Sequence, residues 1–290
     1  MEFKVTSFYK YVNIKNIEEL TEEIRKFCKD NDILGRILLA EEGINGAFSA
    51  TNENTKKFKE WVKKKEIFSD LIFKEQECEQ HVYHKLVVRK RNEIVSFGYS
   101  VDMKRTADHI PPEKLKEWID SDEDIILLDA RNKYEYKIGR FKGAKCLPIN
   151  TFRDFPKQIV KLKDKKDKKI VMYCTGGVRC EKSSAFLKEE GFNNLYQLEG
   201  GIINFVNKFP ENYFEGSCFV FDDRIVSHIK DNSPISKCEH CGEFSGDYVN
   251  CHNLDCDKLT IICDKCQEKT HKTCSSACFI APRQRKSVSG

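Results

Sequence analysis

The sequence lacks any long apolar run. No stretch reaches the ~18 apolar residues needed to cross a bilayer, and the segment that follows Met1 does not pair basic residues with an apolar run as a signal peptide does. We therefore expect a cytoplasmic protein with no membrane partner. A strong charge of one sign is also missing, because 50 Lys and Arg residues face 46 Asp and Glu residues, so the net charge of +4 indicates no class of partner. The absence of a dinucleotide-binding motif predicts no nicotinamide or flavin site, and no 2-His-1-carboxylate iron signature is present.

The composition is otherwise that of a folded protein with several domains. The 290 residues are 40% hydrophobic and 11% aromatic, which excludes a disordered chain and predicts two or three units with cores of their own. Fourteen cysteines are present, and eight of them lie between Cys238 and Cys278. Because cytosolic thiols stay reduced, metal binding and thiolate chemistry are favoured over disulfides. We predict domains at 1–100, 108–215 and 216–290, the last with a cysteine-rich module at 238–278.

The first unit has the order of a ferredoxin-like fold. Residues 4–14 predict a strand, 17–29 an amphipathic helix, 34–50 two strands, 55–64 a second helix, and 85–88 with 94–97 a return to strand. This β-α-β-β-α-β order predicts one sheet with both helices on one face. The glycines of the segment Glu41–Gly46 predict a tight turn, in which Asn45 either adopts left-handed geometry, as we favour, or reads a base.

The second unit alternates short apolar runs with helical patterns. The runs at 125–128, 170–173 and 195–198 are apolar on both faces, as strands of a parallel sheet between helices must be. The fold class is therefore α+β and α/β multidomain, with a central α/β domain. Pro111 and Pro112 predict a linker that leads into a helix at 113–119. The lysine-rich run 161–169 favours a solvated loop over nucleic-acid contact.

A single cysteine occupies the position where such folds bind ligands. Cys174 follows the strand at 170–173, and a glycine-containing loop then leads into a helix. Gly176 and Gly177 allow the backbone to turn several N–H groups inward, and Arg179 adds a positive charge. Such a cradle favours thiolate over thiol, so we predict that Cys174 is a reactive nucleophile rather than a small core residue. Cys180 either resolves an oxidised Cys174 or packs beneath the loop.

The C-terminal cysteines have the spacing of metal-binding knuckles. Two C-x2-C pairs place Cys238, Cys241, Cys263 and Cys266 for one tetrahedral zinc site. A second site could use Cys251, Cys256, Cys274 and Cys278, with His252 or His271 as substitutes. We expect one or two structural zinc ions, because four thiolates leave no open position and the module has little core without metal.

One basic segment offers contacts for a nucleic acid. Between His81 and Arg91 the chain carries four basic residues and a nearby tyrosine, and no acidic residue. The basic residues are Lys85, Arg89, Lys90 and Arg91. Phosphate binding and base stacking are both available there, and a solvated basic surface is the alternative.

The central unit resembles a rhodanese domain. The resemblance rests on Leu128–Gly139, on Phe141–Ala144 and on the Cys174 loop. It implies that Cys174 carries a persulfide and that Asp129 and Arg131 brace the domain. Arg140 stands where many rhodaneses have histidine. The related phosphatases have a loop one residue longer, so the shorter loop here fits sulfur better than phosphate.

The resemblance extends to a larger family. Leu39–Gly46, Tyr173–Lys182 and Phe219–Arg224 together are similar to motifs of the rhodanese-type tRNA uridine hydroxylases. This resemblance implies that oxygen is the cosubstrate, that the wobble uridine in the anticodon arm becomes 5-hydroxyuridine, and that Cys174 is essential. It also tips the basic segment toward RNA contact and leaves an electron or sulfur donor unidentified.

Two other functions stay open from sequence. The chain could pass persulfide sulfur from Cys174 to an acceptor as a sulfurtransferase. It could instead be a noncatalytic protein that binds RNA or another partner on a rhodanese scaffold.

Overall fold

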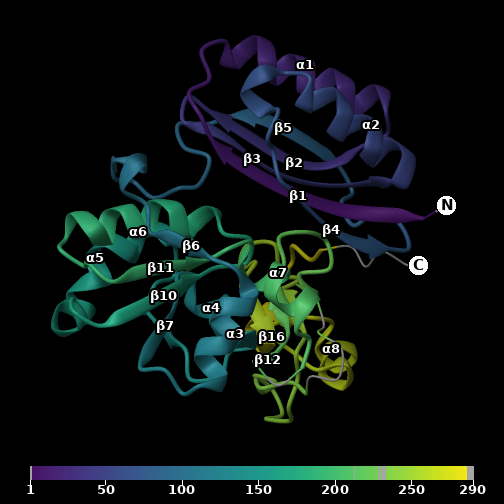
Figure 1. Cartoon of the computed structure of the whole chain (residues 1–290). Helices are drawn as coiled ribbons and strands as arrows, with labels where there is room; N and C mark the ends of the chain where they lie inside the picture. Colours follow the sequence, from purple (N-terminus) through teal and green to yellow (C-terminus); the bar gives the residue numbers. More distant parts are fainter. Residues whose placement is uncertain (1, 212, 228, 230–232, 286–290) are drawn as a thin grey trace. The chain divides into compact units, whose positions relative to one another are not determined.

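A computed structural model describes residues 2–211, 213–227, 229 and 233–285. Its chain forms two compact units, of which one comprises 1–133 with 144–208 and the other comprises 134–143 with 209–290 (Figure 1). None of the helices in these described ranges combines the length and the apolar character needed to cross a membrane.

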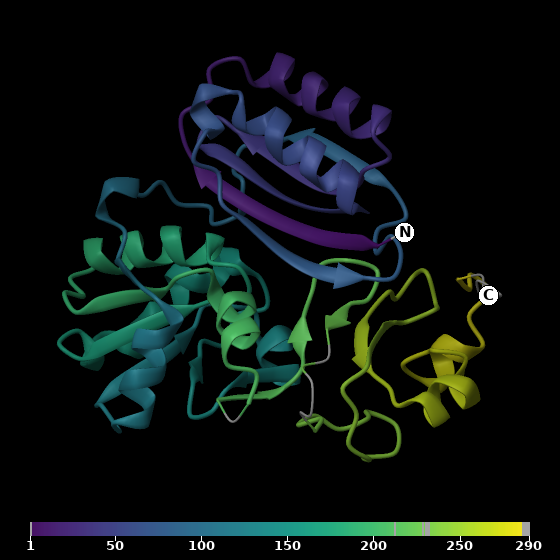
Figure 2. The same cartoon turned by 45° about the vertical axis from the view of Figure 1, so that its right-hand side comes forward.

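The first unit begins with an antiparallel sheet that carries two helices. Its elements are β1 (Phe3–Tyr11), α1 (Ile17–Asp30), β2 (Leu34–Ala40), β3 (Gly43–Thr51), α2 (Asn52–Lys63), a 3-10 turn (Glu66–Phe68), β4 (Phe73–Cys78) and β5 (Leu86–Lys90). The strand order is β4-β1-β3-β2-β5, and β5 runs parallel to β2. Both helices lie on the same face of the sheet (Figure 2). The predicted ferredoxin-like order is confirmed.

The two helices form because their apolar residues fall on one side. Helix α1 buries Ile17, Leu20, Ile24 and Cys28, at spacings of three and four residues. Helix α2 buries Phe58, whose ring packs against rings from the sheet. The side chain of Thr51 caps α2 by accepting the N–H of Asn54.

The sequence pattern missed one strand of this sheet. Strand β4 spans Phe73–Cys78, whereas the strand predicted at 85–88 is confirmed as β5, and residues 94–97 form no strand. The β4 segment reads FKEQEC, without apolar alternation, because it is an edge strand held partly by ion pairs. Glu75 forms two of these pairs, one with Lys4 of β1 and one with Lys59 of α2. Polar edge strands do not show the period-two hydrophobic signal.

The predicted turn geometry of Asn45 is wrong. The hairpin turns at residues 41–42, so Asn45 and Gly46 lie within β3. The backbone of Asn45 is extended rather than left-handed, and its side-chain amide donates to the carbonyl of Ile94 at 3.0 Å. Gly46 is needed because a Cβ there would lie 2.6 Å from the ring of Phe8.

The rest of the first unit is a parallel sheet between helices, as predicted. Its strands are β6 (Asp108–Ile110), β7 (Ile125–Asp129), β9 (Lys145–Cys146), β10 (Lys169–Tyr173) and β11 (Leu195–Leu198). Its helices are α3 (Pro112–Asp120), α5 (Phe155–Gln158), α6 (Val178–Glu189) and α7 (Gly201–Lys208), with 3-10 segments at Met103–Arg105, Phe152–Asp154 and Ile159–Lys165. The strand order is β6-β11-β10-β7-β9. Helix α5 packs with α6, and α3 packs with α7 (Figure 1).

The predicted linker before this sheet is partly a strand. Residues 108–110 form the edge strand β6, parallel to β11, and the helix begins at Pro112. Pro111 ends the strand and Pro112 fits the first turn of the helix, where an N–H would have no partner.

The described residues of the other compact unit, 134–143 with 209–290, form short ribbons and helices. Its elements are α4 (Lys133–Ile138), β8 (Gly139–Phe141), β12 (Phe214–Gly216), β13 (Cys218–Phe219), β14 (Val226–Ser227), β15 (Tyr248–Asn250), β16 (Leu259–Ile261), α8 (Asp264–Thr270) and α9 (Ser276–Phe279). The strands pair as β8 with β12, β13 with β14, and β15 with β16. A small core joins Ile138, Phe219, Val226, Tyr248 and Ile261.

Candidate active site and cysteine clusters

Cys174 lies at the carboxyl end of a buried strand. Strand β10 ends at Tyr173, α6 begins at Val178, and the loop between them holds Cys174 with 1% of its surface exposed. The N–H of Gly177 donates to the sulfur at 3.1 Å. Gly177 adopts a φ of 105°, which favours glycine, and a Cβ there would lie 2.8 Å from the hydroxyl oxygen of Tyr9. The loop therefore points backbone donors at the sulfur.

The surroundings of Cys174 favour its ionised form. Burial alone would raise the pKa of this thiol, but a hydrogen bond from Cys180, the charge of Arg179 and the N–H groups of Arg179 and Gly177 lower it to about 5. Burial and the neighbouring Cys174 raise the pKa of Cys180 well above its usual value. At neutral pH the pair is thus a thiolate that accepts a hydrogen bond from a thiol.

Helix α7 and Arg179 hold the loop from two sides. The N–H groups of Ile202 and Ile203, at the start of α7, donate to the carbonyls of Cys174 and Thr175 at 3.0 and 3.2 Å. The guanidinium of Arg179 donates to the hydroxyl of Thr175 at 3.3 Å. The arginine is 6% exposed, so its charge acts in a region of low dielectric.

Asp129 and Arg131 form a buried ion pair at the end of the neighbouring strand β7. Both residues are fully buried, and the guanidinium meets the carboxylate through two contacts, Nε to Oδ1 at 2.9 Å and Nη2 to Oδ2 at 2.6 Å. The guanidinium also lies 5.8 Å from the ring centroid of Tyr173, the residue before Cys174. Bidentate geometry of this kind fixes the side chains on both strand ends.

Sequence reasoning missed the residues that the ferredoxin-like sheet contributes to the loop. The hydroxyl of Tyr9 donates to Glu181 at 2.9 Å, Tyr11 donates to the carbonyl of Val178 at 3.2 Å, and the ammonium of Lys74 contacts the carbonyl of Gly176. No local pattern announces such contacts, because each joins residues about a hundred or more positions apart.

A second missed contact joins two of the family-like segments. Lys182, in α6, is 2% exposed and its ammonium lies 2.9 Å from Glu42 and 2.7 Å from Glu93. Glu42 belongs to the segment Leu39–Gly46, and Lys182 ends the segment Tyr173–Lys182. A basic residue this buried and between two acids could have been suspected only from the tertiary structure.

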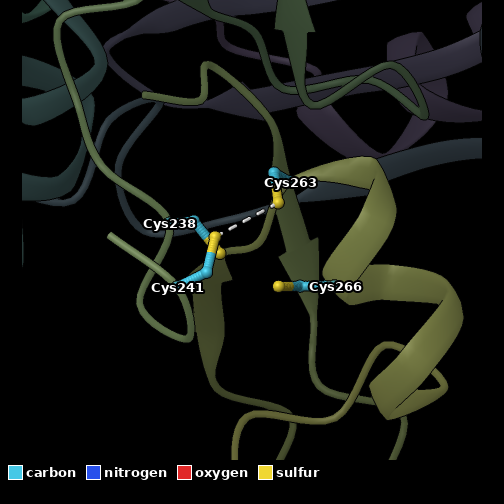
Figure 3. Close-up of side chains that lie close together, drawn as sticks. All are labelled: Cys238, Cys241, Cys263 and Cys266. Atoms are coloured by element: carbon cyan, nitrogen blue, oxygen red, sulfur yellow. Dashed lines mark hydrogen bonds between the residues drawn. The ribbon is translucent and has the colours of Figure 1, made fainter. Parts of the chain in front are cut away.

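The first cysteine cluster brings together two knuckles. The sulfur atoms of Cys238, Cys241, Cys263 and Cys266 lie within 4.8 Å of one another (Figure 3). Cys263 precedes α8 and Cys266 lies on it, while Cys241 approaches Cys263 with a sulfur-to-sulfur distance of 3.6 Å. This group of four is the one that the C-x2-C spacing indicated, and it could hold a metal ion.

The second cluster joins the four remaining cysteines of the module. The sulfur atoms of Cys251, Cys256, Cys274 and Cys278 also lie within 4.8 Å of one another. His252 and His271, considered as substitutes, belong to neither group. His271 instead ends α8 in left-handed geometry.

The basic residues lie on and beside strand β5. Lys85, Arg89, Lys90 and Arg91 are all exposed. Lys90 forms an ion pair with Glu18, which reduces the charge it offers to other partners. In the lysine-rich run 161–169, Lys168 pairs with Asp124 at 2.7 Å and Lys169 pairs with Glu123 at 2.6 Å, both in the segment just before β7.

Comparisons with known families divide the chain into three matched segments. Residues 3–94 match the UPF0176 acylphosphatase like domain, 111–208 match the rhodanese-like domain, and 215–279 match the rhodanase C-terminal family.

Curated relatives match nearly the whole chain. A tRNA uridine(34) hydroxylase of Cytophaga hutchinsonii is 40% identical and covers 98% of this chain and 92% of its own length. Proteins of the same name from Staphylococcus haemolyticus and Protochlamydia amoebophila are 41% and 38% identical, each over 98% of this chain and 91% and 90% of their own lengths. The chain belongs to the tRNA uridine(34) hydroxylase family. The resemblance inferred from the three segments is confirmed.

Proposed function

We propose that this chain hydroxylates the wobble uridine of tRNA at carbon 5 and yields 5-hydroxyuridine. The observation that carries the proposal is the similarity of about 40% identity, over nearly the full length, to proteins named for this activity. The loop of Cys174 adds a chemical reason, because a thiolate held by backbone N–H groups and a buried arginine is a nucleophile at neutral pH.

Each loop residue has a distinct part in this proposal. Cys174 is the reactive group, as thiolate or persulfide. Gly177, with its φ of 105°, lets the backbone turn its N–H toward the sulfur, Gly176 beside it carries the carbonyl that Lys74 contacts, and Arg179 supplies charge. Cys180, whose thiol stays protonated, donates a hydrogen bond to the thiolate rather than competing as a nucleophile.

Asp129 and Arg131 act as a brace rather than as catalytic groups. Their ion pair is fully buried beside Tyr173 and so has no access to a substrate. Loss of one partner would leave an uncompensated buried charge, which typically costs about 3 to 5 kcal/mol.

The substrate and cosubstrates belong to the same proposal. The phosphates of the tRNA anticodon arm bind to four basic residues, Lys85, Arg89, Lys90 and Arg91. The reaction takes place in the cytoplasm. Molecular oxygen supplies the new oxygen atom, and an unidentified donor supplies the electrons. No flavin or nicotinamide is part of the proposal.

Zinc is the metal that best fits the two cysteine clusters. Eight thiolate ligands in two sets of four match the soft, tetrahedral coordination that zinc prefers, and each set is complete without a water ligand. Bound zinc would supply folding energy and no chemistry. We therefore assign one zinc to each set as a structural ion.

Nucleoside analysis tests the function. Cells that lack the gene are complemented with wild type, with Cys174→Ser or with the matched control Cys28→Ser, and tRNA nucleosides are quantified by mass spectrometry. Cys28 is also buried but sits in the apolar core of α1, where burial raises its pKa to about 12. We expect Cys174→Ser to reduce 5-hydroxyuridine at least about 1000-fold, as losses of catalytic nucleophiles do. Wild-type levels with Cys174→Ser would exclude the thiolate from the reaction.

Sulfur transfer is the second candidate. It is favoured by the match to the rhodanese-like domain and by the short loop, in which four residues separate Cys174 from Arg179. Thiosulfate:cyanide activity of the purified protein, with unchanged 5-hydroxyuridine in the deletion strain, would support it over hydroxylation. A noncatalytic binding protein would show neither activity and no effect of Cys174→Ser.

A further inference from the structure

The ferredoxin-like sheet presents one face to its helices and offers polar groups on the other. Side chains alternate along a strand, so Phe8 packs with Phe58 of α2 while Tyr9 and Tyr11 project from the opposite side of the sheet. Lys74 pairs with Ser7 across β1 and β4, which places it on the same face as Tyr9. This helix-free face therefore combines two tyrosines and a lysine.

These three side chains contact three consecutive residues, at the end of the Cys174 loop and the start of α6. Lys74 contacts the carbonyl of Gly176, the ring of Tyr9 covers Gly177, and Tyr11 donates to the carbonyl of Val178. Gly177 is also the residue whose N–H donates to the sulfur of Cys174. The sheet thus touches the loop on both sides of the donor that holds the thiolate.

A buried carboxylate fixes the position of Tyr9. Glu181, in the first turn of α6, accepts hydrogen bonds from Tyr9 at 2.9 Å, from His109 at 2.9 Å and from Gln197 at 3.0 Å. The Tyr9 ring in turn lies 4.9 Å from the ammonium of Lys74, at cation-π distance. The ammonium of Lys74 is therefore held by the carbonyl of Gly176 and by the ring of Tyr9.

Electrostatics agree with this geometry. Burial lowers the pKa of Lys74 to about 8, and the charge of Cys174 is the largest of the effects that oppose this decrease. An ammonium in such a place stays charged at neutral pH partly because an anion lies nearby.

We propose that Lys74 is a positioning residue that acts with Arg179 to hold the Cys174 sulfur as an anion. The ferredoxin-like sheet then has a role besides RNA binding, because it supplies Lys74, the second cation beside the Cys174 loop after Arg179. This role rests on the proposed function only in taking Cys174 as the reactive group. Since the lysine and the cysteine come from different domains, correct docking of the sheet is a condition for an active thiolate.

Several other groups face this charge pair. From α6 they are Arg179, Cys180 and Glu181, from β1 they are Tyr9 and Tyr11, and Glu199 follows β11. His109 of β6 acts through Glu181. The test therefore compares variants at one position and leaves these groups in place.

Alkylation of Cys174 by iodoacetamide measures the thiolate without tRNA or oxygen. Trypsin releases Ile170–Arg179, which contains Cys174 and not Cys180, so mass spectrometry follows this one sulfur in the full-length protein. Rates are measured between about pH 4 and pH 9 for wild type, Lys74→Gln, Lys74→Met and Lys74→Arg. Lys4→Met is the matched control, because Lys4 also joins β1 to β4 but through Glu75.

The two uncharged variants separate charge from the hydrogen bond. Glutamine can still donate to Gly176 but carries no charge, whereas methionine does neither. We expect both to raise the pH midpoint of alkylation by about 0.5 to 1, and Lys74→Arg and Lys4→Met to leave it at the wild-type value. Circular dichroism checks the fold.

A wild-type midpoint in Lys74→Gln would overturn the proposal, since the lysine would then only hold the loop. If methionine prevents folding, glutamine alone still decides between charge and contact. If no variant hydroxylates tRNA, and wild type does not either, the proposed function is contradicted. The alkylation result would still decide the role of Lys74.

Discussion

Cys174 and the cysteines of the C-terminal clusters are held by opposite means. The Cys174 sulfur lies in a large buried core, where it accepts hydrogen bonds from a backbone N–H and from the Cys180 thiol. In the clusters four sulfur atoms lie within 4.8 Å of one another, and around the first of them the buried core is only Cys238, Ile262 and Cys266. Protein dipoles stabilise the single thiolate, but four thiolates repel one another unless a cation lies among them.

The difference teaches where each sulfur can act. A thiolate stabilised by N–H groups keeps its lone pairs free for a substrate, so the cradle of Cys174 suits chemistry. Thiolates shared around a metal have no free coordination position to offer, so the clusters suit folding. Removing the stabilising partner should therefore unfold one region and only change the reactivity of the other.

Metal removal should give the largest effect. Structural zinc contributes about 10 kcal/mol or more to the folding of small modules, so chelation of the full-length protein should expose the backbone amides of 238–279. The N–H of Cys251, which donates to Lys258, is one such amide, whereas the amides of β10 should stay protected. Hydrogen exchange followed by mass spectrometry measures both regions in one experiment, and elemental analysis should give two zinc per chain.

Two matched variants complete that experiment. Cys241→Ser removes a cluster ligand, while Cys218→Ser changes a buried cysteine of the same unit that belongs to neither cluster. Only the first should mimic chelation. A metal-free protein with full protection over 238–279 would contradict a structural role for metal.

The pH dependence of stability should distinguish the Cys174 thiolate from an ordinary buried thiol, with a smaller effect than metal removal. An unfolded cysteine titrates near about 8.5, and the pKa of Cys174 falls to about 5 in the folded protein. Its stabilising contribution is present above the unfolded value and is lost as the pH falls from about 8.5 to about 5, by a few kcal/mol. In Cys174→Ser this part of the decrease should vanish.

Urea unfolding of wild type, Cys174→Ser and Cys28→Ser at several pH values checks this difference. Cys28 stays protonated throughout that range, because burial raises its pKa to about 12, so its variant should follow the wild-type pH dependence. An equal pH dependence in Cys174→Ser and wild type would mean that Cys174 is not ionised in the folded protein.

The features of this molecule that could be predicted are those determined by short segments of the sequence. The Cys174 loop was evident because strand, cysteine, glycine pair and arginine follow one another within ten residues. The first cysteine cluster followed from C-x2-C spacing, which alone brings two sulfur atoms onto one knuckle. The two amphipathic helices followed from the period of their apolar residues.

The parts that sequence did not reveal depend on distant packing or lack a hydrophobic signal. Strand β4 is polar because it lies at a sheet edge, so no alternation marked it. Tyr9 and Lys74 reach the loop only after two domains have packed together, and nothing near either residue in sequence indicates a thiolate. Asn45 was misjudged because Asn between glycines favours turns, whereas its amide instead bonds across to Ile94.

The smallest expected effect is on the salt dependence of tRNA binding. It tests whether the basic segment or the cysteine-rich module binds the tRNA. Arg89 and Arg91 are exposed and far in sequence from both kinds of thiolate, so Arg89→Ala with Arg91→Ala should weaken tRNA binding and leave Cys174 alkylation unchanged. Each lost phosphate contact lowers the slope of log affinity against log salt by roughly 0.7 to 0.9. The double variant should therefore lose about 1.4 to 1.8 from this slope.

Lys161→Ala with Lys163→Ala is the matched pair, because it removes the same charge from exposed residues of the lysine-rich run. Binding is measured by filter retention at several salt concentrations, and this pair should keep the wild-type slope, since we expect that run to be a solvated surface before β10. If instead the arginine pair keeps the wild-type slope and affinity, the basic segment is only a solvated face of β5. The tRNA contacts would then have to come from the lysine-rich run or from the surface of the module that the clusters hold together.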